Sequence, residues 1–174
     1  MAEKQTQHYL RSFNVNEKLL SSIDNGIVIL DENLTIFYYN EWLEIHTKQK
    51  ESDLLQKSLA NIFTEVNQKT LKRKIRTALK MDTPAFYAAS TSKYLISIKL
   101  NQLNVTDYEH MRQGVSVVPF DKEKGLVALV ITDQTNITNT NTLLEINILK
   151  VKELNTQLVK ERETIDKKSD SHEV

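Results

Sequence analysis

The chain of 174 residues contains no cysteine, only three glycines and only two prolines. Without cysteine it has no disulfide, no zinc–thiolate or iron–sulfur site, and no thiol nucleophile. The scarcity of glycine disfavours the glycine-rich loops that cradle phosphate groups. The motifs Gly-x-Ser-x-Gly and His-Glu-x-x-His are also missing. The sequence therefore predicts a protein that is not an enzyme.

The chain has no excess of charge of either sign. It carries 23 Lys and Arg residues against 23 Asp and Glu residues, which gives a formal net charge of zero. Nucleic-acid-binding proteins usually present a broad basic surface, so no nucleic-acid partner is expected. One short basic run, Lys72-Arg73-Lys74 with Arg76, lies in a helical pattern and is interpreted as a solvated helix face.

Long apolar runs are missing as well. No stretch approaches the roughly 20 apolar residues that cross a bilayer. The N-terminus is polar and lacks the apolar region of a signal peptide. We therefore expect a cytosolic protein without a membrane partner.

The N-terminal half mixes helical and strand patterns. Residues 1–22 have the pattern of an N-terminal helical extension. Apolar runs at 27–30 and 34–39 flank a tight turn and predict a β-hairpin. Asn40 suits the N-cap of the next helix, because its side chain can accept a hydrogen bond from a free amide of the first turn. Residues 54–63 then indicate broken helical turns.

A longer helix is predicted over residues 65–81, and Pro84 ends it because the residue before a proline is disfavoured in the helical conformation. Three strands follow at 93–103, 111–120 and 125–132, while residues 85–92 suit either strand or loop. Strands that alternate apolar and polar residues are typical of antiparallel sheets with one buried face. The order predicts an α+β fold, with one five-stranded antiparallel sheet, helices on one face and helical extensions at both ends.

The C-terminal region predicts a dimer helix. Leu144, Val151, Leu158 and Ile165 are spaced by seven residues, and Ile148 and Leu154 widen the apolar stripe that they form. A seven-residue repeat keeps one seam facing a partner helix, and a buried Asn such as Asn147 can set the register. The alternatives are a helix packed on its own domain and a frayed tail. The polar residues 167–174 are expected to be disordered.

The order of these pieces resembles a PAS domain. The resemblance covers residues 16–140 and is carried by Ile23-Asp-Asn-Gly-Ile-Val-Ile-Leu-Asp31, Leu34-Thr-Ile-Phe-Tyr-Tyr-Asn40 and Val130-Ile-Thr-Asp-Gln-Thr135. The segment Tyr108–Pro119 is similar to PAS domains that precede bacterial diguanylate cyclases, and the module as a whole is also similar to those of sensor kinases.

The resemblance implies a domain organisation and a role. Residues 23–135 would form a sensory or dimerising PAS module, residues 136–166 a signalling helix, and residues 167–174 a tail. Such modules often pass a signal to a kinase, cyclase or phosphodiesterase. None of these effectors is recognised in the sequence, so the chain is either a free-standing PAS protein or a fragment.

The resemblance also implies a site for a small ligand between the sheet and its helices. The candidate lining residues are Ile27, Ile29, Ile36, Tyr38, Trp42, Ile75, Leu95, Ser97, Val115 and Val117. A ligand pocket needs an apolar lining with a few convergent polar groups. The same positions also suit a filled hydrophobic core, and the sequence leaves both interpretations open.

Cofactor identity stays open, and the sequence favours none. Haem would require an axial ligand, for which His46 and His110 are candidates, whereas the helix predicted over 65–81 contains no histidine. Without cysteine, the flavin–cysteine adduct of photosensing PAS domains is excluded, and only non-covalent flavin remains open.

Asp133 and Thr135 match the Asp-x-Thr junction at the end of PAS domains. Both side chains can accept hydrogen bonds from free amides near a helix N-terminus, either as a hinge or as a simple cap. The sequence thus predicts a homodimeric module that senses a small ligand or a partner and signals to an effector protein through its C-terminal helix. The alternative is a ligand-free module for protein–protein interaction and dimerisation.

Overall fold

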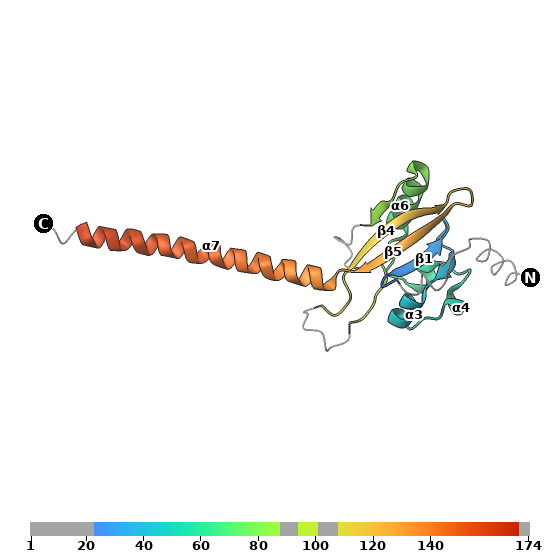
Figure 1. Ribbon diagram of the computed structural model, residues 1–174, viewed down its shortest axis with the longest axis horizontal. Coiled ribbons are helices and arrows are strands. Elements are labelled where there is room, and N and C mark those ends of the chain that lie inside the picture. The colour runs from blue at the N-terminus through green and yellow to red at the C-terminus, as the bar shows by residue number, and fades with distance from the viewer. Residues whose placement is uncertain (1–22, 88–93, 101–107, 171–174) are drawn as a thin grey trace, which may run out of the picture. The chain divides into compact units, whose positions relative to one another are not determined.

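The computed structural model describes residues 23–87, 94–100 and 108–170, with side chains of the last helix described to residue 164 (Figure 1). The chain divides into two compact units, one that ends at Thr135 and one that begins at Asn136. Each unit is described by itself.

The first unit is built on a five-stranded antiparallel sheet, which confirms the predicted fold class. Its strands are β1 (Gly26–Leu30), β2 (Ile36–Tyr39), β3 (Ala85–Tyr87), β4 (Gln113–Asp121) and β5 (Leu126–Asp133). The order across the sheet is β2-β1-β5-β4-β3, so the first and last strands of the chain are neighbours at its centre. The register of this central pair runs from Gly26↔Ile131 to Leu30↔Val127.

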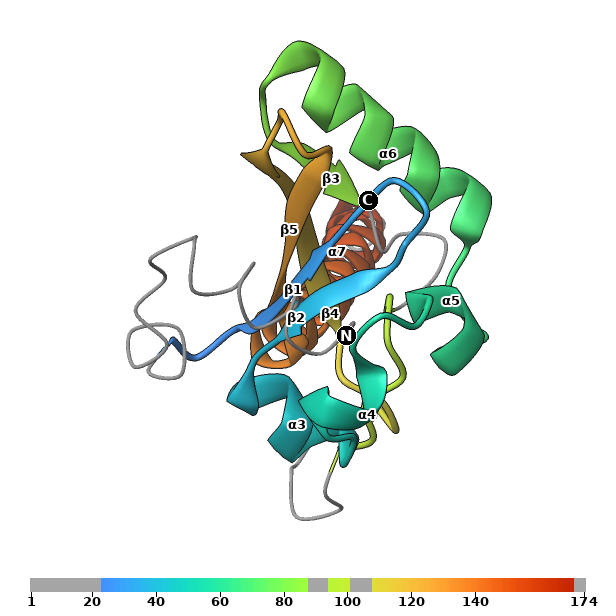
Figure 2. The same ribbon diagram turned by 90° about the vertical axis from the view of Figure 1, so that its right-hand side faces the viewer.

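Four helices connect β2 to β3. They are α3 (Glu41–Thr47), α4 (Glu51–Leu54), α5 (Leu59–Ile62) and α6 (Gln68–Met81). The short α4 and α5 confirm the broken helical turns, and Figure 2 shows α6 lying beside the strands. All four helices contribute side chains to the same core as one face of the sheet.

Alternation along the strands determines which sheet face the helices cover. The strand residues of the core are Val28, Leu30, Ile36, Tyr39, Tyr87, Val115, Val117, Val127, Leu129 and Ile131. Successive side chains of a strand point to opposite faces, so these positions define the inner face. Helix α6 meets this face with the predicted apolar stripe, Leu71, Ile75, Ala78 and Leu79.

The third strand differs from the prediction. We expected a strand at 93–103, but β3 is Ala85–Tyr87. Within the described residues 94–100, Lys99 forms an isolated bridge with His110, and none of these residues belongs to a strand of the sheet. Leu95, Ile96 and Ile98 are nevertheless buried in the core. The apolar pattern of these residues therefore reflects their burial in the core and not hydrogen bonding within the sheet.

Asn40 forms the predicted N-cap of α3. It also connects this helix to the start of the sheet. Its side-chain oxygen accepts hydrogen bonds from the amides of Leu43 (3.4 Å) and Ile27 (2.9 Å), and its side-chain nitrogen donates to the carbonyl of Asn25 (2.9 Å). Asn67 makes a simpler cap on α6, where it accepts from the amide of Thr70 at 3.0 Å. Helix α6 thus begins three residues later than the expected residue 65.

Helix α7 spans Thr135–Asp170. All of this helix except Thr135 belongs to the second unit. The helix continues through residues 167–170, four residues beyond the predicted end at 166. The N-terminal extension predicted at 1–22 and the tail residues 171–174 lie outside the described residues. Within the described part of the chain, no helix has the length and apolar character needed to cross a bilayer.

The two asparagine caps allow a matched test of the fold. We expect Asn67→Ala to lower the free energy of unfolding by about 1 kcal/mol, as loss of an exposed N-cap usually does. Asn40→Ala should cost about 2–3 kcal/mol, because it also leaves the buried Ile27 amide without its partner. Urea unfolding followed by circular dichroism measures both. Equal losses in the two variants would contradict the linking role of Asn40.

Candidate functional site

The structure brings together six of the ten candidate pocket residues. Those that lie in one buried core are Ile36, Trp42, Ile75, Leu95, Val115 and Val117. The structure places the other four elsewhere. Ile27, Ile29 and Tyr38 alternate with inner-face residues and therefore lie on the opposite sheet face, while Ser97 is exposed and its amide donates to Glu65.

An irregularity in β2 places a tyrosine that the sequence analysis missed. The register pairs Leu30 with Ile36 but Ile29 with Tyr38, so β2 has one extra residue, and Tyr39 points inward rather than outward. Simple alternation does not foresee such a bulge. Tyr39 is therefore the buried hydroxyl of the inner face, where Tyr38 was expected.

The Tyr39 hydroxyl has a defined hydrogen-bond role. The Thr47 hydroxyl donates to the carbonyl of Leu43 at 2.7 Å, and it lies 2.8 Å from the Tyr39 hydroxyl. A threonine hydroxyl has one hydrogen, so Tyr39 is the donor to Thr47. Burial raises the pKa of Tyr39 above its ordinary value, and the side chain remains a neutral donor at physiological pH.

The two candidate haem ligands lie in different parts of the fold. The ring of His46, in α3, stacks on Trp42 with a centroid separation of 3.9 Å, and its Nδ1 lies 2.7 Å from the Trp42 carbonyl. His110 precedes β4, and its ring lies 5.1 Å from that of Tyr94. Among the described residues, no group of three or more His, Asp or Glu side chains suits a metal ion.

Gln113, the first residue of β4, holds the buried segment 94–100 in place. Its Oε1 accepts from the amides of Leu95 (2.9 Å) and Ile96 (3.2 Å), and its Nε2 donates to the carbonyl of Ile96 (2.7 Å). The side chain is only 2% exposed. Buried backbone groups need hydrogen-bond partners, and here one side-chain amide provides them. We call these three bonds the Gln113 clasp.

The preceding residue, Arg112, holds the end of β5 and the start of α7. Its carbonyl accepts from the amide of Gln134 at 2.7 Å, and its amide donates to the hydroxyl of Thr135 at 3.0 Å. Asp133 accepts from the Thr135 amide at 2.8 Å. The Thr135 hydroxyl thus bonds to the segment before β4, whereas the sequence analysis expected a bond to a helix amide. We call these three bonds the α7 junction.

Close packing adds to the α7 junction. A Cβ atom added at Gly114 would clash with Nε2 of Gln134, so the Gln134 side chain lies directly over this glycine. Three consecutive residues, 112–114, therefore contact both the buried segment 94–100 and residues 134–135. Asp133 and Thr135 were predicted from the sequence, but Gln113 was not, although its polar side chain in an apolar strand was an available signal.

The candidate dimer residues of α7 are exposed in the single chain. Leu144, Ile148, Val151, Leu154 and Leu158 each keep more than half of their surface accessible. The side chain of Ile165 lies outside the described residues. Further exposed apolar residues, which the seven-residue spacing does not include, are Ile137, Leu143, Ile146, Leu149 and Val159. The apolar surface of α7 is therefore broader than one seam.

The sheet order, the helices on one face and the helix that follows the last strand define an α+β domain with the architecture expected of a PAS module. The family model described as PAS fold matches residues 16–118, which is more than half of the chain. The chain belongs to this family. No curated protein matches the chain.

The chain is similar to solved structures at low sequence identity. An RNA-binding light-oxygen-voltage receptor is 15% identical with a TM-score of 0.51, over 75% of this chain and 35% of that chain. A sensory box sensor histidine kinase from Vibrio cholerae is 23% identical with a TM-score of 0.45, over 74% of this chain and 96% of that chain.

A third similar structure is the PAS domain of the quorum-sensing receptor RpfR from Cronobacter turicensis, in complex with C12:0. It is 16% identical with a TM-score of 0.47, over 66% of this chain and 97% of that chain.

The Gln113 clasp predicts a large loss of stability on substitution. Gln113→Leu keeps the approximate volume but leaves two amides and one carbonyl of residues 95–96 without partners, so we expect a loss of about 3 kcal/mol or more. The exposed Gln68→Leu variant is the control and should stay within about 0.5 kcal/mol of the wild type. Urea unfolding followed by Trp42 fluorescence measures both. Similar values for the two variants would show that the clasp contributes little.

Proposed function

We propose that this PAS protein is a cytosolic sensory module that detects a small ligand or a partner protein and passes its state to α7. The observation that carries the proposal is the adjacency of two sets of contacts. Gln113 bonds to the buried segment 94–100, while Arg112, one residue away, bonds to Gln134 and Thr135 at the start of α7. Because the two residues are neighbours in the chain, a displacement of Gln113 also moves the backbone of Arg112 and alters its bonds to Gln134 and Thr135.

The buried segment is the element that a ligand would displace. Leu95, Ile96 and Ile98 fill space between the sheet and its helices, in the same core as the five other candidate pocket residues that lie there. A molecule that enters this core competes with these side chains and shifts their backbone. Because a ligand moves an equilibrium only by its differential affinity for two states, the two states proposed are clasp closed and clasp open.

Helix α7 is the proposed output. Its exposed apolar residues include Leu144, Val151 and Leu158, spaced by seven, and a second copy of the chain supplies the same spacing in register. Exposed apolar patches of this kind mark interaction sites. We propose a parallel homodimer through α7, and an effector protein rather than this chain as the source of any catalysis.

The second candidate function is a ligand-free interaction module. It is favoured by the packing of Leu95, Ile96 and Ile98, which are at most 2% exposed in the core where a ligand would bind. In this case the clasp is permanent, and α7 serves dimerisation alone. A ligand that co-purifies or raises the melting temperature distinguishes the sensory module from this alternative.

Native mass spectrometry with an absorption spectrum tests both the ligand and the dimer. We expect a dimer for the wild type, and extra non-covalent mass if a ligand co-purifies. Val151→Lys places a charge in the proposed seam and should give a monomer, whereas Thr156→Lys adds the same charge on another side of α7 and should stay dimeric. A wild-type monomer would contradict the dimer. A clean apo dimer would favour the interaction module.

The coupling between the Gln113 clasp and the α7 junction can be tested without a ligand. Thr135→Val keeps the shape of the side chain but removes the acceptor for the Arg112 amide. Because coupling is reciprocal, we expect faster amide exchange at residues 95–96 and 112–113 as well as at the start of α7. Hydrogen-exchange mass spectrometry measures this, with the exposed Thr132→Val as control. Changes confined to residues near 135 would show that the two contact sets are independent.

A further inference from the structure

Helix α6 presents a straight row of positive charge. It contains six lysine and arginine residues and no acidic residue. Four of these, Lys69, Arg73, Arg76 and Lys80, are exposed and spaced by four, three and four residues. At 3.6 residues per turn, this spacing confines them to an arc of about 60° over a length of about 16 Å. We call these four residues the basic ridge.

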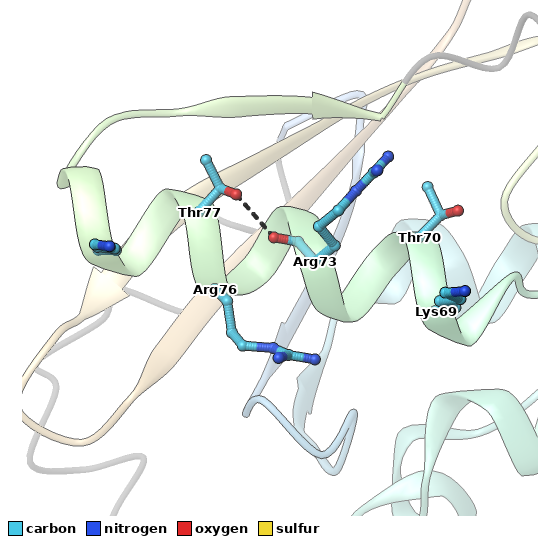
Figure 3. A pocket seen from close by; sticks show the side chains of 6 residues that line it. Lys69, Thr70, Arg73, Arg76 and Thr77 are labelled. Atoms are coloured by element: carbon cyan, nitrogen blue, oxygen red, sulfur yellow. Dashed lines mark hydrogen bonds between the residues drawn. The ribbon is translucent and has the colours of Figure 1, made fainter.

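Burial of the opposite face of α6 fixes the direction in which the basic ridge points. Leu71, Ile75, Ala78 and Leu79 are packed into the core, so the helix has a defined rotation about its axis. Figure 3 shows Arg73 and Arg76 leaving the helix on its two flanks, with Lys69, Thr70 and Thr77 along the same exposed surface. The six residues that line the shallow hollow here are the basic ridge, Thr70 and Thr77.

The charge of the basic ridge is not neutralised within the described residues. The ion pairs there join Lys50 to Glu44, Lys122 to Asp82 and Lys124 to Asp121, and none includes a ridge residue. The acidic residue just before α6, Glu65, instead accepts from the amide of Ser97.

Within the ridge itself, like charges face one another. Lys69 and Arg73 are four residues apart, as are Arg76 and Lys80, and like charges at this spacing destabilise a helix. The fold thus retains a row of cations at a cost to α6.

We propose that the basic ridge docks an acidic helical segment of another protein, about three turns long. The shallow hollow lies on the exposed face of a single helix and has no second wall to hold an extended peptide, whereas a second helix can place carboxylates along the same line. Arginine forks suit carboxylates because they donate two parallel hydrogen bonds. Such complementarity mainly raises the association rate and the specificity. The proposal is independent of the sensory function proposed above.

The charge of the rest of the chain favours a short acidic segment over a long polyanion. Apart from α6, the chain has 17 basic residues (23 minus 6) against 23 acidic ones, hence a formal charge of −6. The Debye length is about 8 Å at physiological ionic strength. A nucleic acid or a membrane extends beyond the basic ridge and would be repelled by the net negative charge of the rest of the chain. A three-turn segment stays within the ridge and avoids this repulsion.

The composition of the ridge surface supports the same choice. Besides the four cations, the residues that line the hollow are Thr70 and Thr77. Binding of single-stranded nucleic acid uses aromatic side chains for base stacking, and interfacial membrane binding uses an apolar face. The lining of the hollow provides neither.

The first experiment uses a designed probe peptide and the full chain. The probe is a fluorescein-labelled helical peptide of about 15 residues, with four Glu spaced by four, three and four positions to match the ridge. Its control is the same peptide with Gln in place of Glu. Fluorescence anisotropy should show saturable binding of the Glu peptide, weakened at least about tenfold between about 50 and 300 mM NaCl. The Gln peptide should bind at least about tenfold more weakly.

Two matched double variants locate the binding surface. Arg73→Glu/Arg76→Glu should weaken binding of the Glu peptide at least about tenfold. Lys57→Glu/Lys160→Glu alters the net charge by the same amount at exposed positions outside the basic ridge, and should bind like the wild type. The ridge variant should not lose melting temperature, because Lys69 and Lys80 then each face a Glu four residues away.

Three outcomes would overturn the proposal. These are no saturable binding to the wild type, equal loss of binding in the two double variants, and tighter binding of a duplex oligonucleotide or of phosphatidylserine-containing vesicles than of the Glu peptide. The last outcome would assign the ridge to nucleic acid or to membrane instead.

Discussion

The need to satisfy buried backbone groups constrains this fold more than any other factor. Residues 94–100 enter the core without a neighbouring strand, so the polar groups of residues 95–96 lack the partners that a sheet would supply. The Gln113 side chain replaces them, because an amide, like a peptide unit, both donates and accepts. The Gln113 side chain thus supports the burial of Leu95 and Ile96, while the carbonyl of Ile98 accepts from the amide of Met111.

The same part of the chain organises the end of the domain. Arg112 lies next to Gln113 and uses both its amide and its carbonyl on residues 134–135, while Gly114 leaves room for the side chain of Gln134. Backbone bonds made in this way are short and directional, so a shift at residues 112–114 changes the geometry at the start of α7. Residues 112–114 therefore connect the buried segment 94–100 to the end of the central strand β5.

Helix α6 shows how one element can serve two surfaces. Its apolar stripe closes the core, and its cations lie on the opposite side, where they do not disturb packing. Because the chain is neutral overall, this local charge is balanced by acidic residues elsewhere, and net charge alone conceals it. A surface of this kind is found only by placing each charge on its helix.

Most of the architecture could be predicted from local patterns. The Asn40 cap, the broken turns of α4 and α5, the buried stripe of α6 and the long last helix all follow from short-range periodicity and capping chemistry. The fold class also follows, since a one-sided apolar sheet needs helices on that face.

The candidate site was less predictable, because the facing of a strand residue depends on register. The extra residue in β2 turns Tyr39 inward and leaves Tyr38 on the other face, and alternation in β1 puts Ile27 and Ile29 there as well. A shift of one residue reverses every side chain of a strand, and the sequence of one strand does not contain its pairing.

The sequence by itself determined the helices, the caps and the class of fold, because these depend on interactions between residues close in the chain. Only the tertiary structure decided that residues 94–100 leave the sheet and that Gln113 bonds to them across 17–18 positions. It likewise decided that Thr135 bonds to Arg112, 23 positions away. Such contacts arise from the packing of distant segments, which local patterns do not encode.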